Sequence, residues 1–126
     1  MDGLLSALES AAEARDADAF VARLSERFLG QDDLGKSDAH AALRRYFAAY
    51  ESIALERHDL ERTRQDGSAR VRCTVAFTGT TRRAFGLENL LPPSALYRFD
   101  LTARDEGGTW RVSRAAWERI EGLPGP

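Results

Sequence analysis

Alternation of apolar and polar side chains is clearest near the C-terminal end of the chain. Over residues 97–101, and again from Trp110, apolar side chains recur at every second position, and an acidic, glycine-rich segment at 106–108 separates the two runs. This period is typical of strands that have one buried and one solvated face. Glycine adopts positive φ readily and so favours tight turns. The pattern therefore predicts a β-hairpin.

Two more strands are predicted before this hairpin. Residues 71–77 alternate between apolar and polar side chains and give the cleanest strand pattern in the chain. Residues 53–65 are also typical of a strand, but their apolar positions change parity, which indicates a bulge near 57–59. Asp66–Gly67 between the two runs is a strong signal for a hairpin turn. The C-terminal half of the chain is thus expected to form an antiparallel meander.

Helical spacing dominates the N-terminal part of the chain. Residues from about 2 to 15 are expected to form a first, modestly amphipathic helix. Asp16 is a suitable N-cap for a second helix, which Gly30 would end, and Ser37 is expected to cap a third. The apolar positions that define the buried faces of the second and third helices are Phe20, Leu24 and Phe28, and then Ala39, Leu43, Phe47 and Tyr50.

Residues 79–94 show no period and end in Pro92–Pro93, which excludes this segment from a central strand. Its apolar content is high for a loop, so it is expected to cover the mouth of a cavity or to contact a partner subunit. The side chains expected in this role are Phe85, Leu87, Leu90 and Leu91.

Length and charge limit the functional classes. The 126 residues suit a single domain spanning 1–126, with an ordered core of about 3–121. The net charge of −2 gives no general attraction to nucleic acid or to anionic lipid. Acidic residues are interspersed among the basic ones, which favours cross-strand ion pairs on a solvated outer face of the sheet. The arginines expected there are Arg57, Arg62, Arg64, Arg70, Arg72, Arg98, Arg104 and Arg111.

Targeting signals are absent from the sequence as it stands. No apolar run has the length of a membrane span, and the start, Met1–Asp2–Gly3, lacks the basic and apolar regions of an export signal. This predicts a cytoplasmic protein. The alternative is that Asp2 and Gly3 replace a removed leader, which would make the protein periplasmic or a lipoprotein. The single cysteine, Cys73, excludes an internal disulfide and leaves the compartment open.

Short motifs along the chain occur in an order that resembles a known superfamily. They are Ala14–Arg15–Asp16–Ala17, Gly35–Lys36, Tyr46–Phe47 and Gly108–Thr109–Trp110–Arg111–Val112. The chain resembles the nuclear transport factor 2-like superfamily, whose fold ketosteroid isomerase and polyketide cyclase relatives share, and it is similar to small bacterial members. The resemblance implies an α+β fold in which three N-terminal helices pack in the concavity of a curved, mostly antiparallel sheet, a cystatin-like cone.

In such a fold the concave face of the sheet lines a pocket. Strand parity then predicts an almost wholly apolar lining, which can bind a small hydrophobic molecule or be filled by the protein's own side chains. The predicted lining is Phe20, Leu24, Phe47, Tyr50, Val71, Cys73, Val75, Phe77, Tyr97, Phe99, Leu101, Trp110 and Val112.

The isomerases of this superfamily use an Asp base together with a Tyr and a protonated Asp as hydrogen-bond donors. No tyrosine lies in the first predicted helix to match the Tyr donor, and Asp100 lies between two apolar strand residues and so points away from the cone. Asp32 and Asp33 lie near the place where the resemblance implies the base. They are therefore candidate bases, although their hydrophilic loop equally suits solvated carboxylates.

His58 is the third catalytic candidate, because the predicted bulge could turn its side chain into the cone. His40 follows a core position of the third helix and is expected on the surface. Neither histidine has another ligand at metal-binding spacing, so no metal and no cofactor are predicted. Cys73 is expected to be a small core residue, with His58 as the base if it were instead a nucleophile.

Two hypotheses follow. The first is a non-catalytic domain that binds a small apolar ligand or acts as a dimeric interaction module, because the lining lacks a convergent acid, base or metal set. The arginine-bearing face of the sheet would suit a homodimer. The second is an isomerase-, cyclase- or dehydratase-like enzyme that acts on a hydrophobic small molecule with Asp32, Asp33 or His58.

Overall fold

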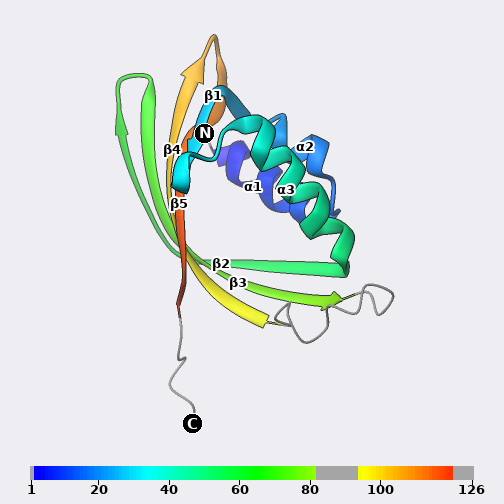
Figure 1. Cartoon of the computed structure of the whole chain (residues 1–126). Coiled ribbons are helices and arrows are strands. Elements are labelled where there is room, and N and C mark those ends of the chain that lie inside the picture. Colours follow the sequence, from blue (N-terminus) through cyan, green and yellow to red (C-terminus); the bar gives the residue numbers. More distant parts are fainter. Residues whose placement is uncertain (1, 82–93, 121–126) are drawn as a thin grey trace.

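The computed structural model describes residues 2–81 and 94–120 of the chain. Three helices lie against one face of a strongly curved sheet (Figure 1). They are α1 (Asp2–Glu13), α2 (Ala17–Val21) and α3 (Lys36–Ala49). The predicted α+β architecture, with helices in the concavity of a curved sheet, is confirmed. Within the described ranges, no helix is long and apolar enough to cross a membrane.

The sheet has five strands in the order β1-β5-β4-β3-β2. Strand β1 runs parallel to β5, and the other neighbours are antiparallel. A short 3-10 helix, η1 (Gln31–Asp33), joins β1 to α3. The strands are β1 (Leu24–Gly30), β2 (Tyr50–Gln65), β3 (Ser68–Thr81), β4 (Ser94–Glu106) and β5 (Thr109–Ile120).

The prediction that the second helix continues to Gly30 is wrong, because α2 ends at Val21 and residues 24–30 form strand β1. The apolar positions Leu24 and Phe28 are four residues apart, which places them on one face of either a helix or a strand. Pairing with the free edge of β5 selects the strand over the helix. Leu24 pairs with Val112, and the Val112 amide donates to the carbonyl of Arg23 at 2.9 Å.

The helix boundaries follow local capping chemistry. The carboxylate of Asp16 accepts a hydrogen bond from the Ala19 amide at 3.0 Å, so the predicted N-cap of α2 is confirmed. The prediction that Ser37 caps the third helix is wrong. Gly35 occupies the N-cap position of α3 and offers no side chain to the first turn.

The meander contains both predicted turns and the predicted bulge. Pairing between β2 and β3 shifts register between His58 and Glu61, where Asp59 has a φ of 52°. The aperiodic segment was predicted to begin at residue 79, whereas β3 continues through Thr81. The proposed lid or interface residues Phe85, Leu87, Leu90 and Leu91 lie outside the described residues.

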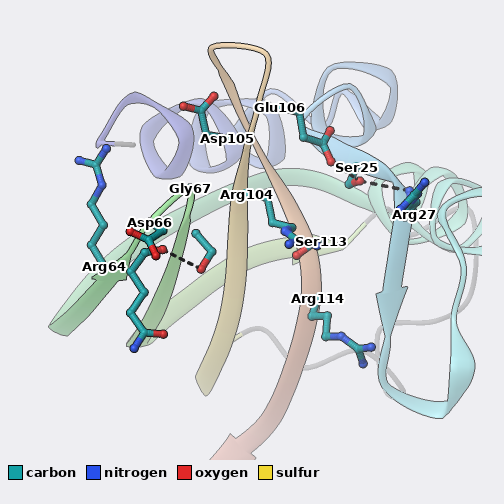
Figure 2. A pocket seen from close by; sticks show the side chains of 12 residues that line it. Ser25, Arg27, Arg64, Asp66, Gly67, Arg104, Asp105, Glu106, Ser113 and Arg114 are labelled. Atoms are coloured by element: carbon teal, nitrogen blue, oxygen red, sulfur yellow. Dashed lines mark hydrogen bonds between the residues drawn. The ribbon is translucent and has the colours of Figure 1, made fainter.

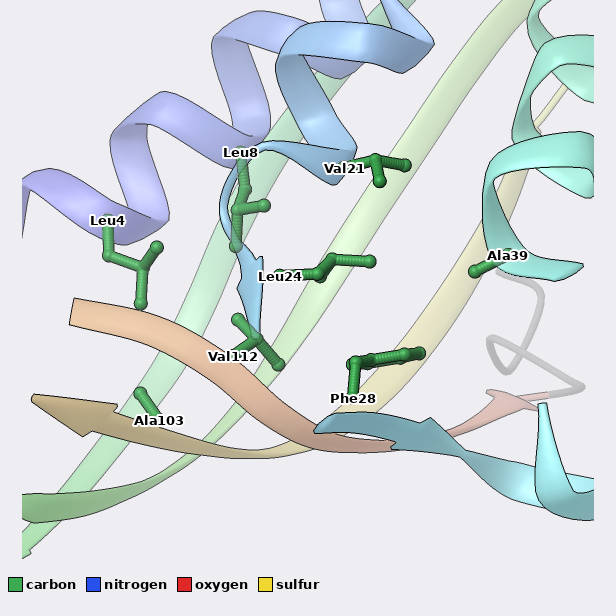
Figure 3. Packing of buried hydrophobic residues seen from close by; sticks show 8 residues of the cluster. All are labelled: Leu4, Leu8, Val21, Leu24, Phe28, Ala39, Ala103 and Val112. Atoms are coloured by element: carbon green, nitrogen blue, oxygen red, sulfur yellow. The ribbon is translucent and has the colours of Figure 1, made fainter. Parts of the chain in front are cut away.

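One buried cluster joins all three helices to the β1–β5 side of the sheet. Figure 3 shows leucines of α1 and Val21 of α2 pointing toward Leu24 and Phe28 of β1 and Val112 of β5. Burying such side chains stabilises a fold by about 1.5–3 kcal/mol each. The cluster consists of Leu4, Leu8, Val21, Leu24, Phe28, Ala39, Ala103 and Val112.

A second cluster lies where α3 passes into β2. Tyr50 is fully buried there and contacts the Phe77 ring edge-on, with 5.1 Å between the ring centroids. Gly79 lies beneath the tyrosine, and a Cβ at this position would come within 2.6 Å of the Tyr50 ring. The missing side chain of Gly79 therefore makes room for Tyr50.

Substituting Gly79 tests this close approach. Gly79→Ala is expected to lower the free energy of unfolding by about 1–3 kcal/mol, because a buried ring and the backbone must move apart. Gly3→Ala is the matched control, since Gly3 lies in α1 with nothing within 4 Å of an added Cβ. It should stabilise by about 0.5–1 kcal/mol through helix propensity. Urea unfolding of both variants measures the difference, and equal effects would contradict this packing.

Candidate functional site

One extra residue in β5 decides which of its side chains face the helices. Ala103 pairs with Val112, but Thr102 pairs with Arg114, so Ser113 has no partner in the ladder. The side chains facing the helices therefore change from even to odd numbers along β5. Beyond Val112, this face continues with Ala115, Trp117 and Arg119, which lie opposite Leu101, Phe99 and Tyr97 of β4.

The outer part of the concave face is only half-buried. Its side chains follow two rows across neighbouring strands: Val75 lies beside Tyr97, and Cys73 lies beside Phe99 and Trp117. Cys73 is buried, whereas the others remain partly open to solvent. We call the half-buried set the concave strip, and it consists of Val75, Tyr97, Phe99, Leu101 and Trp117.

The three tyrosines of the chain meet at one end of the strip. Tyr46 of α3 packs against Tyr50 with 5.1 Å between ring centroids, and its hydroxyl is hydrogen-bonded with Tyr50 and Tyr97. Burial, followed by the hydrogen bond to Tyr50, raises the pKa of Tyr46 far above its usual value. Tyr46 is therefore a neutral phenol that can donate or accept a hydrogen bond at any physiological pH.

Positive charge lies on both sides of the strip. Arg119 lies directly across from Tyr97 on β5, is exposed, and has no ion-pair partner among the described residues. Arg57 lies across from Val75 on β2, and its Nη1 is 3.3 Å from Glu9 Oε1 of α1. The Arg57 Nη1 atom is buried without a hydrogen bond in the described part of the chain. The prediction that Arg57 and Arg62 lie on the outer face is wrong, since they lie across from Val75 and the buried Val71 on the side that faces the helices.

Cys73 lies between these rows as a small buried residue. Burial raises the pKa of its thiol, nearby Arg57 lowers it, and Glu9 raises it again. The net shift is upward, so the thiol is protonated at neutral pH and is a weak nucleophile. His58 lies one residue beyond Arg57 on β2 and its side chain is 46% exposed, 3.6 Å from Glu56. The side chains of Cys73 and His58 are thus on different faces of the sheet.

The catalytic candidates lie on separate elements, and η1 lies beside the strip residue Trp117, whose amide donates a hydrogen bond to Gln31 Oε1 at 2.9 Å. Asp32 and Asp33 lie in η1, both exposed, and both have a φ of 58°. His40 is half-buried on α3 and its Nε2 lies 2.6 Å from Asp18 Oδ1. Asp100 faces outward as expected, where Arg70 donates two hydrogen bonds to it and holds the pKa of its carboxyl below the usual value.

The other predicted lining residues divide into core and strip. Phe47, Tyr50, Val71, Phe77 and Val112 are buried, while Phe20 and Trp110 are half-buried against the core. Leu24 is buried too, but on β1. Sequence reasoning missed Trp117 and Arg119, because the parity of the second strand was extended from Trp110 and Val112. The change from even to odd apolar positions after Val112 was the available signal.

Comparison with known proteins finds relatives by structure alone. No protein-family model matches the chain, and no curated protein matches it in sequence. A protein from Novosphingobium aromaticivorans named "putative aromatic ring hydroxylase" has a TM-score of 0.79 at 16% identity, over 99% of this chain and 90% of that one. A "putative dehydratase" of the nuclear transport factor 2-like family from Streptomyces avermitilis has a TM-score of 0.78 at 13% identity, over 94% of this chain and 93% of that one.

A third similar structure is a nuclear transport factor 2-like protein of unknown function from Pseudomonas putida. Its TM-score is 0.76 at 16% identity, over 98% of this chain and 86% of that one. This chain has the nuclear transport factor 2-like fold. In this fold, Tyr97 of the concave strip packs against the cluster that Phe47 of α3 forms with Phe77 of β3.

The raised pKa of Tyr46 predicts how stability depends on alkaline pH. In the unfolded chain Tyr46 ionises near pH 10, whereas in the folded protein it does so only at higher pH. Its contribution to stability is therefore complete below about pH 10 and is lost as pH rises further. Tyr46→Phe removes this proton linkage and should lose less stability than the wild type between pH 8 and pH 11.

Urea unfolding at these two pH values, and at pH 6 as a reference, measures the effect. Between pH 6 and pH 8 the two proteins should change in parallel, because tyrosine is neutral in both states. Parallel behaviour up to pH 11 as well would contradict a buried, hydrogen-bonded Tyr46.

Proposed function

We propose that this domain binds a small, mainly apolar molecule on the concave strip and does not transform it. The observation that carries this proposal is the partial exposure of Phe99, Leu101 and Trp117 on the face that the helices cover. A solidly packed interior would bury such large side chains, as it buries Tyr50 and Phe77. Accessible apolar surface inside a concavity favours an apolar ligand.

The ends of the strip give the ligand a preferred orientation. Tyr97 combines an apolar ring with a hydroxyl in the tyrosine network, and Arg119 lies across from it. A polar oxygen of the ligand would lie near these two groups, while its apolar part would contact Phe99 and Trp117. A ligand with one carbonyl, carboxylate or sulfonate group and an aromatic or aliphatic body fits this arrangement.

The positions of the candidate bases support binding without catalysis. Some proteins of similar structure are named as a hydroxylase or a dehydratase. A general base must lie within hydrogen-bond reach of its substrate, directly or through one water. Asp32 and Asp33 are exposed in η1, and His58 is on the opposite face of β2 from Arg57. Exposed carboxylates and an outward-facing imidazole support binding over catalysis.

A fluorescent probe tests the proposed ligand site. Anilinonaphthalene sulfonate combines an apolar aromatic body with one anionic group, and its emission rises when it leaves water. It should bind the wild type, and Phe99→Ala should weaken binding by about tenfold through loss of buried apolar contact. Leu60→Ala is the matched control, since Leu60 is a large apolar side chain that is 44% exposed on β2. This control should bind like the wild type.

Thermal melting of both variants establishes that they are folded. Equal binding by wild type, Phe99→Ala and Leu60→Ala would place the probe elsewhere and would contradict the proposal. Tyr97→Phe keeps the ring and removes the hydroxyl, so it isolates the polar contact.

We also propose that residues 1–126 form one domain that is a homodimer. Native mass spectrometry of the purified protein, followed by solvent extraction, reads the oligomeric mass and any bound small molecule together. A stoichiometric apolar compound in the extract is the expected result, whereas a monomer mass would contradict the dimer.

A further inference from the structure

A hollow lies on the outer face of the sheet, and none of its lining residues belongs to the concave strip. It has a volume of about 1090 Å³ and lies over β1, β5, β4 and the turn between β2 and β3. Figure 2 shows Arg104 and Ser113 near its middle, Arg27 and Arg114 toward β1, and Asp105 and Glu106 near the β4–β5 turn. We call it the outer groove.

Arginines of the outer groove differ from other arginines on the same face of the sheet. Toward the other end of β4, Arg70 is hydrogen-bonded to Asp100 and Arg98 to Glu118. In contrast, Arg27, Arg104 and Arg114 of the groove have no ion pair or side-chain hydrogen bond in the described part of the chain. Cross-strand pairing therefore neutralises one part of this face, whereas the groove lining carries four arginines against three carboxylates, Asp66, Asp105 and Glu106.

The carboxylates in the groove are partly engaged elsewhere. Glu106 accepts a hydrogen bond from the Ser25 hydroxyl at 2.6 Å and lies 3.6 Å from Arg111. Asp105 accepts a hydrogen bond from the Gly108 amide in the turn, at 2.7 Å. The fourth lining arginine, Arg64, lies over the Trp110 ring, 5.1 Å from its centroid. These contacts engage Asp105 and Glu106 at the β4–β5 turn, whereas Asp66 is exposed at the β2–β3 turn, and they leave the guanidinium groups of Arg27, Arg104 and Arg114 available.

The arrangement of the three arginines selects the kind of anion. They come from β1, β4 and β5, which are neighbours in the sheet, so their backbones span about 10 Å. An anion that carries several phosphate groups in a chain offers oxygens to all three guanidinium groups. Guanidinium groups bind phosphate oxygens in a bidentate manner and are less strongly hydrated than ammonium groups.

We propose that the outer groove binds a small molecule that carries two or more phosphate groups in a chain. The site is independent of the concave strip, because no residue lining the groove belongs to the strip.

Calorimetric titration of the full chain with inorganic tripolyphosphate tests the proposal. One molecule per chain is expected to bind at 50 mM salt, more weakly at 150 mM salt. Arg104→Gln and Arg114→Gln should each reduce affinity by about tenfold or more. Arg98→Gln is the matched control, because Arg98 is on the same strand and face as Arg104 but is paired with Glu118. It should change affinity less than about twofold.

Two further ligands sharpen the result. Monophosphate should bind at least about tenfold more weakly than tripolyphosphate, because it carries less negative charge and fewer oxygens for the three guanidinium groups. ATP that binds more tightly than tripolyphosphate would assign the groove to nucleotides, and equal or weaker binding would assign it to the phosphate chain alone. Both results support a binding site for linked phosphate groups in the outer groove.

Absence of binding heat with tripolyphosphate at 50 mM salt would overturn the proposal. An equal loss of affinity in Arg98→Gln and Arg104→Gln would also overturn it, since the attraction would then be general to the face. All three substituted arginines are exposed, so melting temperatures close to that of the wild type are expected and serve as the folding control.

Discussion

The close approach of the Tyr50 ring to the Gly79 backbone determines how the helices sit on the sheet. Tyr50 ends α3 and begins β2, so its burial fixes the direction of the helix and the register with β3 at one corner. Tyr46 packs on the same ring and connects it to Tyr97 through its hydroxyl. The helix layer, the start of the meander and the polar end of the concave strip therefore depend on one glycine opposite one aromatic ring.

Single extra residues in two strands shape the rest of the concave face. Ser113 shifts β5 so that Trp117 and Arg119 join the face that carries Tyr97 and Phe99. The irregularity in β2 lies between His58 and Glu61, just beyond Arg57, whose Nη1 is held against α1 through Glu9. Because side chains alternate with a period of two, each insertion exchanges the two faces of everything beyond it. The composition of the concave strip thus depends on where the bulges lie.

Most of the architecture could be predicted from side-chain patterns, since the helix cap at Asp16, both turns and the β2 bulge are local signals. That residues 24–30 form strand β1 could not be predicted, because Leu24 and Phe28 satisfy the helical and strand periods equally. Only the unpaired edge of β5 selects the strand. Trp117 was missed for a related reason: the position of Ser113 in the ladder depends on its partner strand. Arg27 and Arg114 join Arg104 only through the non-local order β1-β5-β4.

The second half of β2 has a consequence for the behaviour of the protein in solution. This strand forms one edge of the sheet, and its last residues, from Asp59 to Gln65, are exposed and mostly charged. The bulge at Asp59 also interrupts the regular row of backbone groups. An edge of this kind resists the addition of a strand from another molecule, because charges must be desolvated and the hydrogen-bonding row is broken. The long hairpin is thereby protected from edge-to-edge aggregation.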